Sequence, residues 1–294
     1  MNLTETLNDV VKAPLHWAFT RYYALRARLR SRSGVHLTPR DPLLIVSLTS
    51  YPKRFGALHL CLESLLSQSY QPDHLILWLG MGQAEQLPLA VTRLQAFGLE
   101  VRVDTDHGPF TKIVHTLRQF PDAIIVTADD DNIYPSWWLK ALVDSYREFP
   151  HAIHCHRGHG MALTSDGRIL PYEQWNYEAI GIGTEPTMRL MPTGVSGVLF
   201  PPHSLHGDVI DTDKNQTLSP TDDDVWLKTM SMLRDVPCRL VGGKSKRFYV
   251  IRETQKTALW RINEPGGRTQ SQMETLLHHY GLQDYFVKVR RRDA

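Results

Sequence analysis

The sequence predicts an α/β fold with a mostly parallel central sheet and helices on both faces. From residue 43 onward, apolar segments of strand length alternate with amphipathic segments of helix length. The connections between them are short, which favours parallel strands joined by helices that pack on the sheet. Hydrophobic residues make up 42% of the chain and charged residues 22%, as in ordinary globular proteins, and 294 residues suffice for one large domain or two small ones.

Four apolar, partly β-branched runs have the length of buried strands, and each precedes a segment with helical spacing. The expected strands cover residues 43–48, 75–79, 99–103 and 123–128, and the expected helices cover residues 57–68, 89–97, 111–120 and 135–149. Gly98 stands at the C-cap position of the second helix, where a left-handed backbone is favoured. Residues 41–150 are therefore expected to form four strand-helix repeats.

The pattern changes after Pro150. Residues 151–191 are rich in glycine, proline and aromatic residues, which is typical of strands with long loops. Gly194 and Gly197 punctuate the next segment, where they let the backbone approach a ligand closely or mark a bend. We divide the chain into an N-terminal segment (1–40), a main domain (41–250) with halves at 41–150 and 151–250, and a helical, basic C-terminal tail (251–294) that includes a helix at 269–280.

Composition excludes several classes of protein. The formal net charge is only +2, so no global field indicates a nucleic-acid partner. Cys61, Cys155 and Cys238 lack CxxC spacing, which predicts neither a disulfide framework nor a zinc site and fits a reducing compartment. No stretch approaches the roughly 18 apolar residues that a membrane span needs. We expect a cytoplasmic protein.

The N-terminal segment predicts an amphipathic basic helix followed by a linker. Its apolar face consists of Val11, Leu15, Ala18, Tyr22 and Leu25, and its arginines are Arg21, Arg26, Arg28, Arg30 and Arg32. Two interpretations stay open. The helix lies on the inner, anionic face of a membrane, helped by Lys288, Arg290, Arg291 and Arg292 at the other terminus, or it packs on the domain with a solvated charged face.

Three consecutive carboxylates, Asp129, Asp130 and Asp131, follow the expected strand 123–128. Carboxylates this close repel one another unless a cation lies among them, and Mg²⁺ and Mn²⁺ prefer oxygen ligands. Open α/β sheets bind ligands at the carboxyl ends of their strands, so the triplet predicts a metal-diphosphate site. If the chain stays extended there, Asp129 and Asp131 share one side and Asp130 faces the other. The alternative is a solvated acidic turn with Asn132 in the bend.

Four histidines, His151, His154, His156 and His159, follow the fourth helix. A structural zinc site needs four good ligands, and no cysteine pair accompanies these histidines. We interpret them mainly as strand and loop residues, and we place His159 close enough to the metal or diphosphate to contribute a ligand.

A second acidic triplet, Asp222, Asp223 and Asp224, precedes an apolar helical segment. Capping and the helix dipole account for one or two carboxylates in the first turn, but not obviously for three. Two separated clusters suit a metal-bound diphosphate together with a general base. This is the division of labour in sugar transfer from a nucleotide diphosphate.

The two clusters give the chain a resemblance to glycosyltransferases of the GT-A fold. Asp129-Asp130-Asp131 resembles their DxD motif, and Asp223-Asp224-Val225 resembles the Glu-Asp pair that carries the base in the inverting, family-2-like branch. The segment Ser47–Arg54 ends the first strand, where this fold receives the nucleotide. The resemblance covers roughly Leu43 to Leu233 and extends to bacterial enzymes of surface-polysaccharide biosynthesis, many of which have no assigned substrate.

The resemblance implies roles for individual residues. The half at 41–150 would bind the nucleotide sugar, a UDP- or GDP-sugar, and the half at 151–250 a glycan or glycolipid acceptor. A divalent metal, Mn²⁺ or Mg²⁺, would be held by Asp131 with Asp129. Asp224, beside Asp223, would be the base of an inverting transfer. The donor would contact Thr49, Tyr51, Arg54, Lys112, Asp129 and Asp130.

The sequence departs from the resembled families in two places. Asp223 replaces the usual glutamate, and the Gln/Arg-rich motif of processive synthases is absent, residues 255–260 being a partial match at most, so transfer of a single sugar is expected. Two alternatives remain. Sugar-nucleotide pyrophosphorylases carry a glycine-rich loop after the first strand, whereas this chain has no glycine there before Gly56. The other alternative is a non-catalytic relative that binds carbohydrate or nucleotide.

Overall fold

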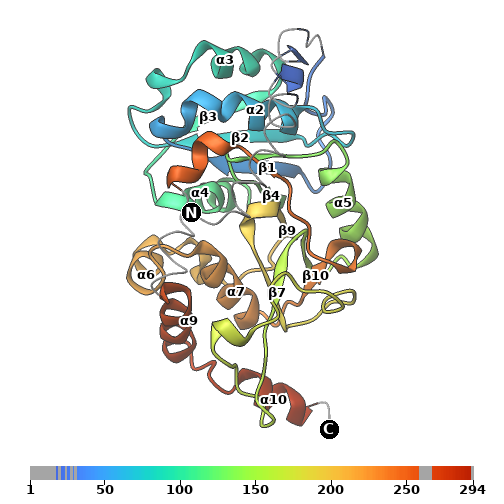
Figure 1. The fold of residues 1–294 in the computed structure, drawn as a ribbon, viewed down its shortest axis with the longest axis vertical. Helices are drawn as coiled ribbons and strands as arrows, with labels where there is room; N and C mark the ends of the chain where they lie inside the picture. Colours follow the sequence, from blue (N-terminus) through green and yellow to red (C-terminus); the bar gives the residue numbers. More distant parts are fainter. Residues whose placement is uncertain are drawn as a thin grey trace, which may run out of the picture.

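The computed structural model describes residues 18, 21–23, 25, 26, 29, 32–257 and 267–292. It confirms the predicted α/β architecture, with a seven-stranded central sheet between helices (Figure 1). The strand order is β10-β6-β9-β4-β1-β2-β3. The strands are β1 (Leu44–Thr49), β2 (His74–Leu79), β3 (Leu99–Val103), β4 (Ile124–Thr127), β6 (Ile153–Cys155), β9 (Val198–Phe200) and β10 (Cys238–Leu240).

Only β9 runs against its neighbours in this sheet. The pairs β3-β2, β2-β1, β1-β4 and β6-β10 are parallel, whereas β9 is antiparallel to both β4 and β6. Val198, at the start of β9, lies opposite Thr127, at the end of β4. The loop that enters β9 therefore reaches the sheet edge at which the parallel strands of the first half end.

The strands and helices of the first half agree closely with the predicted segments. The predicted helices correspond to α2 (Phe55–Leu66), α4 (Thr111–Gln119) and α5 (Trp138–Glu148), and the strands to β1, β2, β3 and β4. The predicted helix 89–97 is split into the short α3 (Leu89–Thr92) and a 3₁₀ segment, Arg93–Phe97. It ends as expected at Gly98, whose φ of 104° lies in the left-handed region.

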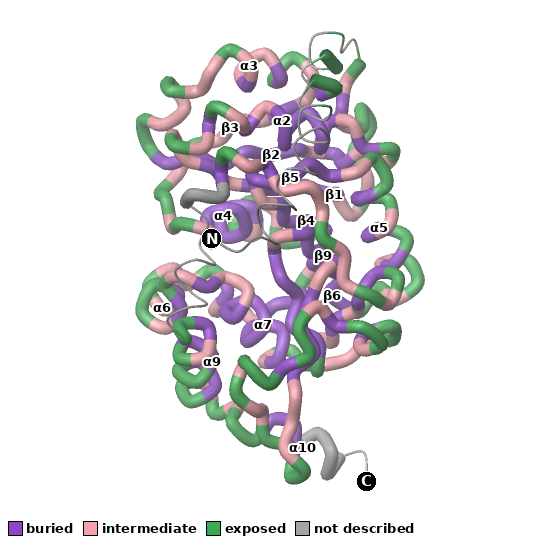
Figure 2. The backbone as a smooth tube through the Cα atoms, viewed as in Figure 1, coloured by how far each residue is buried: buried purple, intermediate pink, exposed green. Residues whose placement is uncertain are grey.

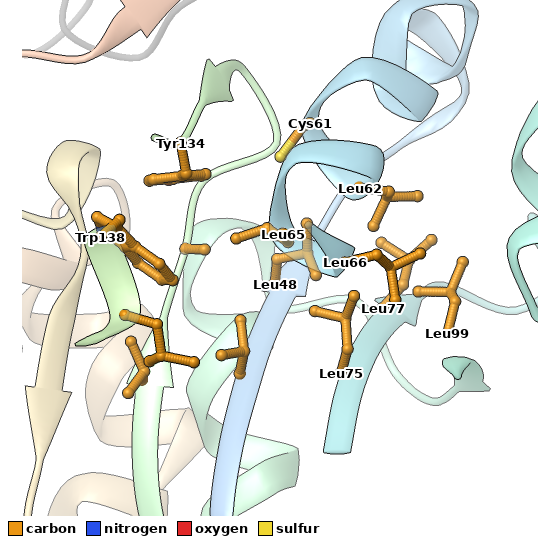
Figure 3. Close-up of a cluster of buried hydrophobic side chains, with 14 of the residues drawn as sticks. Leu48, Cys61, Leu62, Leu65, Leu66, Leu75, Leu77, Leu99, Tyr134 and Trp138 are labelled. Atoms are coloured by element: carbon orange, nitrogen blue, oxygen red, sulfur yellow. The ribbon is translucent and has the colours of Figure 1, made fainter. Parts of the chain in front are cut away.

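Alternating side chains of the strands supply hydrophobic clusters on both faces of the sheet. Val46 and Leu48 of β1 point into a core shared with α2 and α5 (Figure 3). Ile45, the residue before Val46, faces α4 on the opposite side. The second half of the chain continues the α4 face, where α7 (Asp223–Leu233) packs on β9 and β10. Figure 2 shows the resulting layers as buried strands under partly exposed helices.

Two short ribbons complete the sheet structure. β7 (Gly158–Gly160) pairs with β8 (Leu190–Pro192), and the long loop between them leaves the sheet. β5 (Asn132–Ile133) directly follows the first acidic triplet and pairs with β11 (Tyr249–Val250). The pairing places a late segment of the chain beside the acidic loop.

The described part of the predicted C-terminal tail is packed on the domain. Its helices are α9 (Arg268–His279) and α10 (Tyr285–Arg292), and the short α6 (Thr212–Leu218) lies nearby. Met273 and Leu276 of α9 are buried in the same core as α7. Gln272 accepts a hydrogen bond from the backbone N–H of Thr221 (3.1 Å), so α9 supports the start of α7.

The N-terminal helix is described only in part. Tyr23 is buried in the core beside α2, whereas Tyr22, Leu25 and Leu29 are 50%, 55% and 70% exposed. Val11, Leu15, Arg28 and Arg30, which belong to the predicted amphipathic pattern, lie outside the described residues. The described helix thus contacts the domain through a residue outside its predicted apolar face. Within the described ranges, no helix has the length and apolar character to cross a membrane.

Candidate active site

Buried side chains hold the backbone of the loop after β4 through hydrogen bonds. The hydroxyl of Tyr134, which is fully buried, accepts the backbone N–H of Asp129 (2.8 Å) and donates to the carbonyl of Asp129 (3.2 Å). The thiol of Cys61 donates to the same carbonyl (3.3 Å). On the other side, the N–H of Ile251 donates to the carbonyl of Asp131 (2.7 Å). The backbone that presents the three carboxylates is therefore held at both ends.

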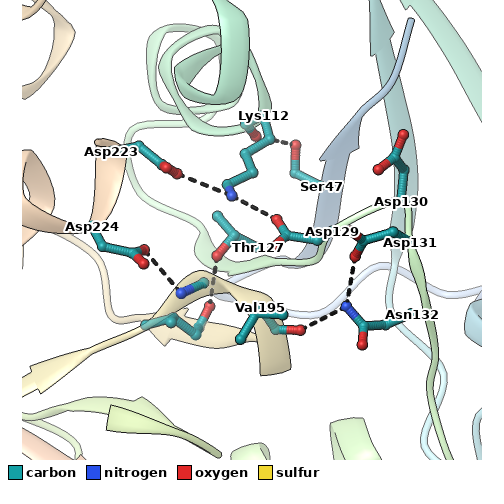
Figure 4. A network of polar contacts seen from close by, with 12 residues as sticks. Ser47, Lys112, Thr127, Asp129, Asp130, Asp131, Asn132, Val195, Asp223 and Asp224 are labelled. Atoms are coloured by element: carbon teal, nitrogen blue, oxygen red, sulfur yellow. Dashed lines mark hydrogen bonds and ion pairs between the residues drawn. The ribbon is translucent and has the colours of Figure 1, made fainter. Parts of the chain in front are cut away.

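Each carboxylate of the first triplet has its own set of partners, and Asp130 and Asp131 share Arg54. Asp129 accepts a hydrogen bond from Lys112 Nζ (2.7 Å), whereas Asp130 accepts from Arg54 (2.5 Å) and from the hydroxyl of Ser50 (2.6 Å). Asp131 accepts from the side-chain amide of Asn132 (2.8 Å) and lies 3.5 Å from Arg54 (Figure 4). The expected sharing of one side by Asp129 and Asp131 stays a prediction: β4 ends at Thr127, before the triplet, yet the charge of Asp129 acts on Asp131 more strongly than the charge of Asp130 does.

The second triplet combines capping with a contribution to the site. Asp222 is the N-cap of α7 and accepts from the backbone N–H of Val225 (3.2 Å) and from the hydroxyl of Thr269 (2.7 Å). Asp223 pairs with Lys112 (3.0 Å). Asp224 accepts the backbone N–H of Gly194 through Oδ1 (2.8 Å). Capping thus explains one of the three carboxylates, and the other two turn toward the first triplet.

Lys112 joins the two triplets. Its ammonium group lies between Asp129 and Asp223, at 2.7 Å and 3.0 Å (Figure 4). Gly194 packs against the same groups: a Cβ built on it would lie 3.1 Å from Asp224 Oδ1 and 3.2 Å from Lys112 Nζ. Residues from four separate stretches of sequence therefore meet at one point. We define the acidic cluster as five aspartates with Lys112 and Arg54; the aspartates are Asp129, Asp130, Asp131, Asp223 and Asp224.

Burial and mutual repulsion raise the pKa of several carboxyls in the acidic cluster. The pKa of Asp131 rises to about 7, because the group is buried and because Asp129 and Asp130 carry like charges. Burial, with the charges of Asp223 and Asp222, raises the pKa of Asp224 well above its ordinary value. Burial alone would lower the pKa of Lys112, but the charges of its carboxylate partners outweigh this and keep the amine protonated. Such perturbed groups are typical of functional sites.

Two of the three predicted donor residues at the end of the first strand lie beside this cluster. The hydroxyl of Thr49 donates to the carbonyl of Trp78 (3.0 Å), which ties it to β2. Tyr51 is half-buried, and the guanidinium of Arg54 lies 5.6 Å from its ring centre. The guanidinium of Arg54 forms an ion pair with the carboxylate of Asp130. Tyr51 and Arg54 thus lie beside the first triplet, as a donor pocket would require.

The negative charge of the acidic cluster suits a divalent cation, but its side chains are not arranged as a complete metal site. Five carboxylates surround two cations, which leaves an excess of negative charge if all are ionised. Yet among the described residues no three His, Cys, Asp or Glu side chains are grouped so as to hold an ion. Mg²⁺ is usually held by one or two carboxylates plus substrate phosphates, so Asp131 and Asp129 remain suitable ligands for a metal that arrives with a diphosphate.

His159 is not grouped with the carboxylates. Its Nδ1 accepts the backbone N–H of Glu178 (2.9 Å), and its ring packs against Tyr177 and Tyr172. Burial lowers the pKa of His159 to about 3, so the ring is neutral. His154 and His156 are buried and bonded to backbone carbonyls of α5 and its C-cap, with the pKa of each lowered by burial to about 4. The interpretation of His154 and His156 as structural residues agrees with these contacts.

Several residues that shape the cluster were not identified from the sequence. Ser50 lies in the predicted nucleotide-binding segment Ser47–Arg54 but received no role of its own, and Tyr134 acts through a single hydroxyl group that no pattern indicates. The sequence predicts only that the backbone at Gly194 can approach a ligand closely. In the structure this backbone approaches Asp224, to which the N–H of Gly194 donates a hydrogen bond. Gly197, with a φ of 91°, forms the bend against the ring of Trp138. The repeated glycine was the one signal available.

Comparison with solved structures finds chains with a similar arrangement of elements. S. aureus TarS 1-349 is 14% identical over 82% of this chain and 72% of its own, with a TM-score of 0.47. Glucosyl-3-phosphoglycerate synthase from Mycobacterium tuberculosis, solved with Mn²⁺, UDP and glucosyl-3-phosphoglycerate, is 14% identical over 82% of this chain and 81% of its own, with a TM-score of 0.42. CMP:2-keto-3-deoxy-manno-octonic acid synthetase, complexed with CTP, is 12% identical over 76% and 98%, with a TM-score of 0.41.

No protein-family model matches the sequence, and comparison with curated protein sequences finds no significant relative. With identities of 12% to 14% and TM-scores of 0.41 to 0.47, the structural similarity does not extend to a family or an activity. The residues of the acidic cluster are the stronger guide to function.

Proposed function

We propose that this protein is a glycosyltransferase of the GT-A type that transfers one sugar from a nucleotide-diphosphate sugar to a hydroxyl of a glycan or glycolipid. The observation that carries the proposal is the meeting of two acidic triplets across Lys112 at the carboxyl ends of β1 and β4. Ligands bind at this edge in open α/β sheets. Surface-polysaccharide biosynthesis in bacteria is the context that the sequence resemblance supports.

In this proposal Asp224 is the general base. Its Oδ1 accepts the N–H of Gly194, which fixes the carboxylate and leaves Oδ2 to take the proton of the acceptor hydroxyl. The raised pKa of Asp224 makes the carboxylate a stronger proton acceptor than an exposed aspartate. Attack from the side opposite the departing diphosphate would invert the configuration of the sugar. Asp223 stays paired with Lys112 and acts beside the base.

Charge on the leaving diphosphate would be met by a divalent cation and by the cationic side chains of the cluster. Asp131 and Asp129 would hold Mn²⁺ or Mg²⁺, which when bound neutralises the diphosphate. Lys112 and Arg54 would orient the donor, and the ion pair of each with a carboxylate of the first triplet supports this role. Tyr51 and Thr49 would line the base and ribose, and Asp130 would contact the ribose or sugar.

A thermal-shift screen tests this function directly. We expect UDP or GDP, or a sugar derivative of either, to raise the melting temperature of the purified protein when Mn²⁺ is present. Binding to the folded state alone stabilises it by about 2.7 kcal/mol at a ligand concentration 100 times the Kd. The same nucleotide without metal should give a much smaller shift.

Two other results would redirect the proposal. A shift with UTP or CTP that exceeds the shift with every nucleoside diphosphate would favour the pyrophosphorylase alternative. Nucleotide binding without release of free nucleotide diphosphate from any sugar donor would favour the non-catalytic alternative. If no nucleotide changes the melting temperature of a folded sample, the proposed function is wrong.

A peripheral contact with an anionic membrane is a further part of the proposal. Tyr22, Leu25 and Leu29 are exposed on the described part of the N-terminal helix, with the exposed Arg21 and Arg26 beside them. Apolar and basic side chains together favour the surface of anionic lipid. We expect vesicles rich in phosphatidylserine to co-sediment the full-length chain at low salt and to release it at high salt. Equal recovery with neutral vesicles would contradict the electrostatic part of this contact.

A further inference from the structure

A packed aromatic group lies in the second half of the chain, on β7 and in the loop that follows it. It consists of His159 of β7 and three residues of the loop between β7 and β8, which together we call the Tyr177 cluster: His159, Tyr172, Trp175 and Tyr177. The ring centres of His159 and Tyr177 are 4.6 Å apart, and Tyr172 lies 5.1 Å from both Tyr177 and Trp175. The four rings form one packed unit.

Tyr177 is the exposed member of this unit. His159 is 2% exposed and Trp175 5%, whereas Tyr177 is 43% exposed. Singly exposed aromatic residues are common, so exposure alone does not indicate a site. Here, however, the exposed ring rests on buried rings that hold it in place, and the hydroxyl of Tyr177 hydrogen bonds to Tyr172. The surface therefore presents a fixed aromatic face.

Charged groups flank that face. The carboxylate of Glu178 accepts hydrogen bonds from Nε of Arg157 (3.0 Å) and from Nε of Arg247. The backbone of Glu178 has a φ of 51°, in the left-handed region that residues with a Cβ seldom adopt. Its N–H donates to the neutral ring of His159, which holds this conformation. Strained residues of this kind concentrate at functional sites.

A continuous set of contacts connects the Tyr177 cluster to the proposed base. Arg157 donates through Nη1 to the hydroxyl of Thr193 (3.0 Å), and the next residue, Gly194, binds Asp224. A second connection is electrostatic. Burial and Tyr177 raise the pKa of Tyr172 most, and the charges of Asp222 and Asp224 raise it further. The aromatic face and the carboxylate of Asp224 thus belong to one neighbourhood.

We propose that Tyr177, with Glu178 and Arg157, forms the subsite for a pyranose ring of the acceptor. The apolar C–H face of a pyranose matches an aromatic ring, and its hydroxyls suit a carboxylate acceptor beside guanidinium donors. Glu178 and Arg157 each retain further hydrogen-bonding capacity after pairing with one another. The assignment of this sugar as the acceptor rests on the proposed function, because it is Asp224 that would deprotonate it.

Binding of simple glycosides tests the subsite without a donor. Saturation-transfer difference NMR would measure the full-length protein with methyl glycosides of glucose, galactose, mannose, N-acetylglucosamine and glucuronic acid. We expect at least one to bind the parent protein and to bind Tyr177→Ala about tenfold more weakly, while Tyr177→Phe, which keeps the aromatic face, retains most of the affinity. Tyr70→Ala is the matched control, because Tyr70 is a half-buried tyrosine held between Arg40 and Arg147, away from the cluster.

The outcomes separate this inference from the proposed function. Failure of every glycoside to bind the parent protein, or equal binding by the parent and Tyr177→Ala, would overturn the subsite even if nucleotide with Mn²⁺ still raises the melting temperature. Loss of glycoside binding in Tyr177→Ala but not in Tyr70→Ala would support the subsite. If that loss occurs in a protein that no nucleotide stabilises, the sugar site stands and the transferase function fails.

Discussion

Asp224→Asn should lower the turnover number for sugar transfer by about a hundredfold or more, with little change in donor affinity. General base catalysis typically contributes this much, and the amide cannot take the proton. Asparagine has the shape of aspartate and still offers an oxygen to the N–H of Gly194, so the local structure should persist. The measurement is kcat at saturating donor and acceptor, together with the donor Kd from a thermal-shift titration.

The matched control for this variant is Asp222→Asn. Asparagine is as good an N-cap as aspartate, and Asp222 faces Val225 and Thr269 instead of the cluster centre. We expect its turnover to stay within a few-fold of the parent. If Asp224→Asn turned over like the parent protein, the base assignment would be wrong, and Asp223 would be tested next.

Asp131→Asn should remove the metal-dependent part of donor binding. The neutral amide is a poorer ligand for Mn²⁺ than a carboxylate, and it contributes no negative charge to the site. We expect the rise in melting temperature that nucleotide produces in the presence of Mn²⁺ to fall to the level seen without metal. A full metal-dependent shift in Asp131→Asn would show that the ion is held elsewhere.

The same variant should be more stable than the parent when metal is absent. The pKa of Asp131 is about 7 in the folded protein against an ordinary value of 3.8. As the pH rises, the unfolded chain therefore loses this proton first, and the free energy of unfolding falls between pH 3.8 and about 7. Asp131→Asn removes that cost. Its melting temperature at pH 8 in EDTA should exceed the parent value, because each kcal/mol of free energy of unfolding regained raises the midpoint by roughly 2–4 °C in a large domain.

A difference that disappears toward pH 4 would identify the ionised carboxylate as its cause. An equal difference at pH 4 and pH 8 would instead indicate a packing effect of the amide. Asp213→Asn serves as a control, because Asp213 is an exposed carboxylate in the first turn of α6, away from the acidic cluster. Its substitution should leave the pH dependence of the melting temperature unchanged.

The position of each acidic triplet was predictable because local patterns determine it. An apolar, β-branched run ends where β4 ends, and the carboxylates follow it. Likewise, a helical segment begins after Asp222, as N-cap preferences indicate. The strand order beyond β4 was not predictable in the same way. β6, β9 and β10 have three residues each, too few for a clear periodic signal.

The partners of individual carboxylates were also beyond prediction from sequence. Lys112 was expected to reach the nucleotide, but not to join Asp129 to Asp223. Such pairing depends on how α4 and α7 pack, and side-chain spacing along one element does not report it. The hydrogen bond from Gly194 to Asp224 comes from the backbone, which every residue except proline can supply, so the sequence carries no mark of it.

The pairing of β9 with strands from both halves of the chain limits how far the halves can move relative to each other. Because β9 is hydrogen bonded to β4 on one side and to β6 on the other, the two halves of the chain form one continuous ladder instead of two bodies joined by a hinge. The distance between Asp224, the proposed base, and the proposed diphosphate site at the first triplet would thus be set by the backbone before any substrate binds. Closure of the site would then fall to loops and side chains, while the reacting groups keep a distance that the backbone alone maintains.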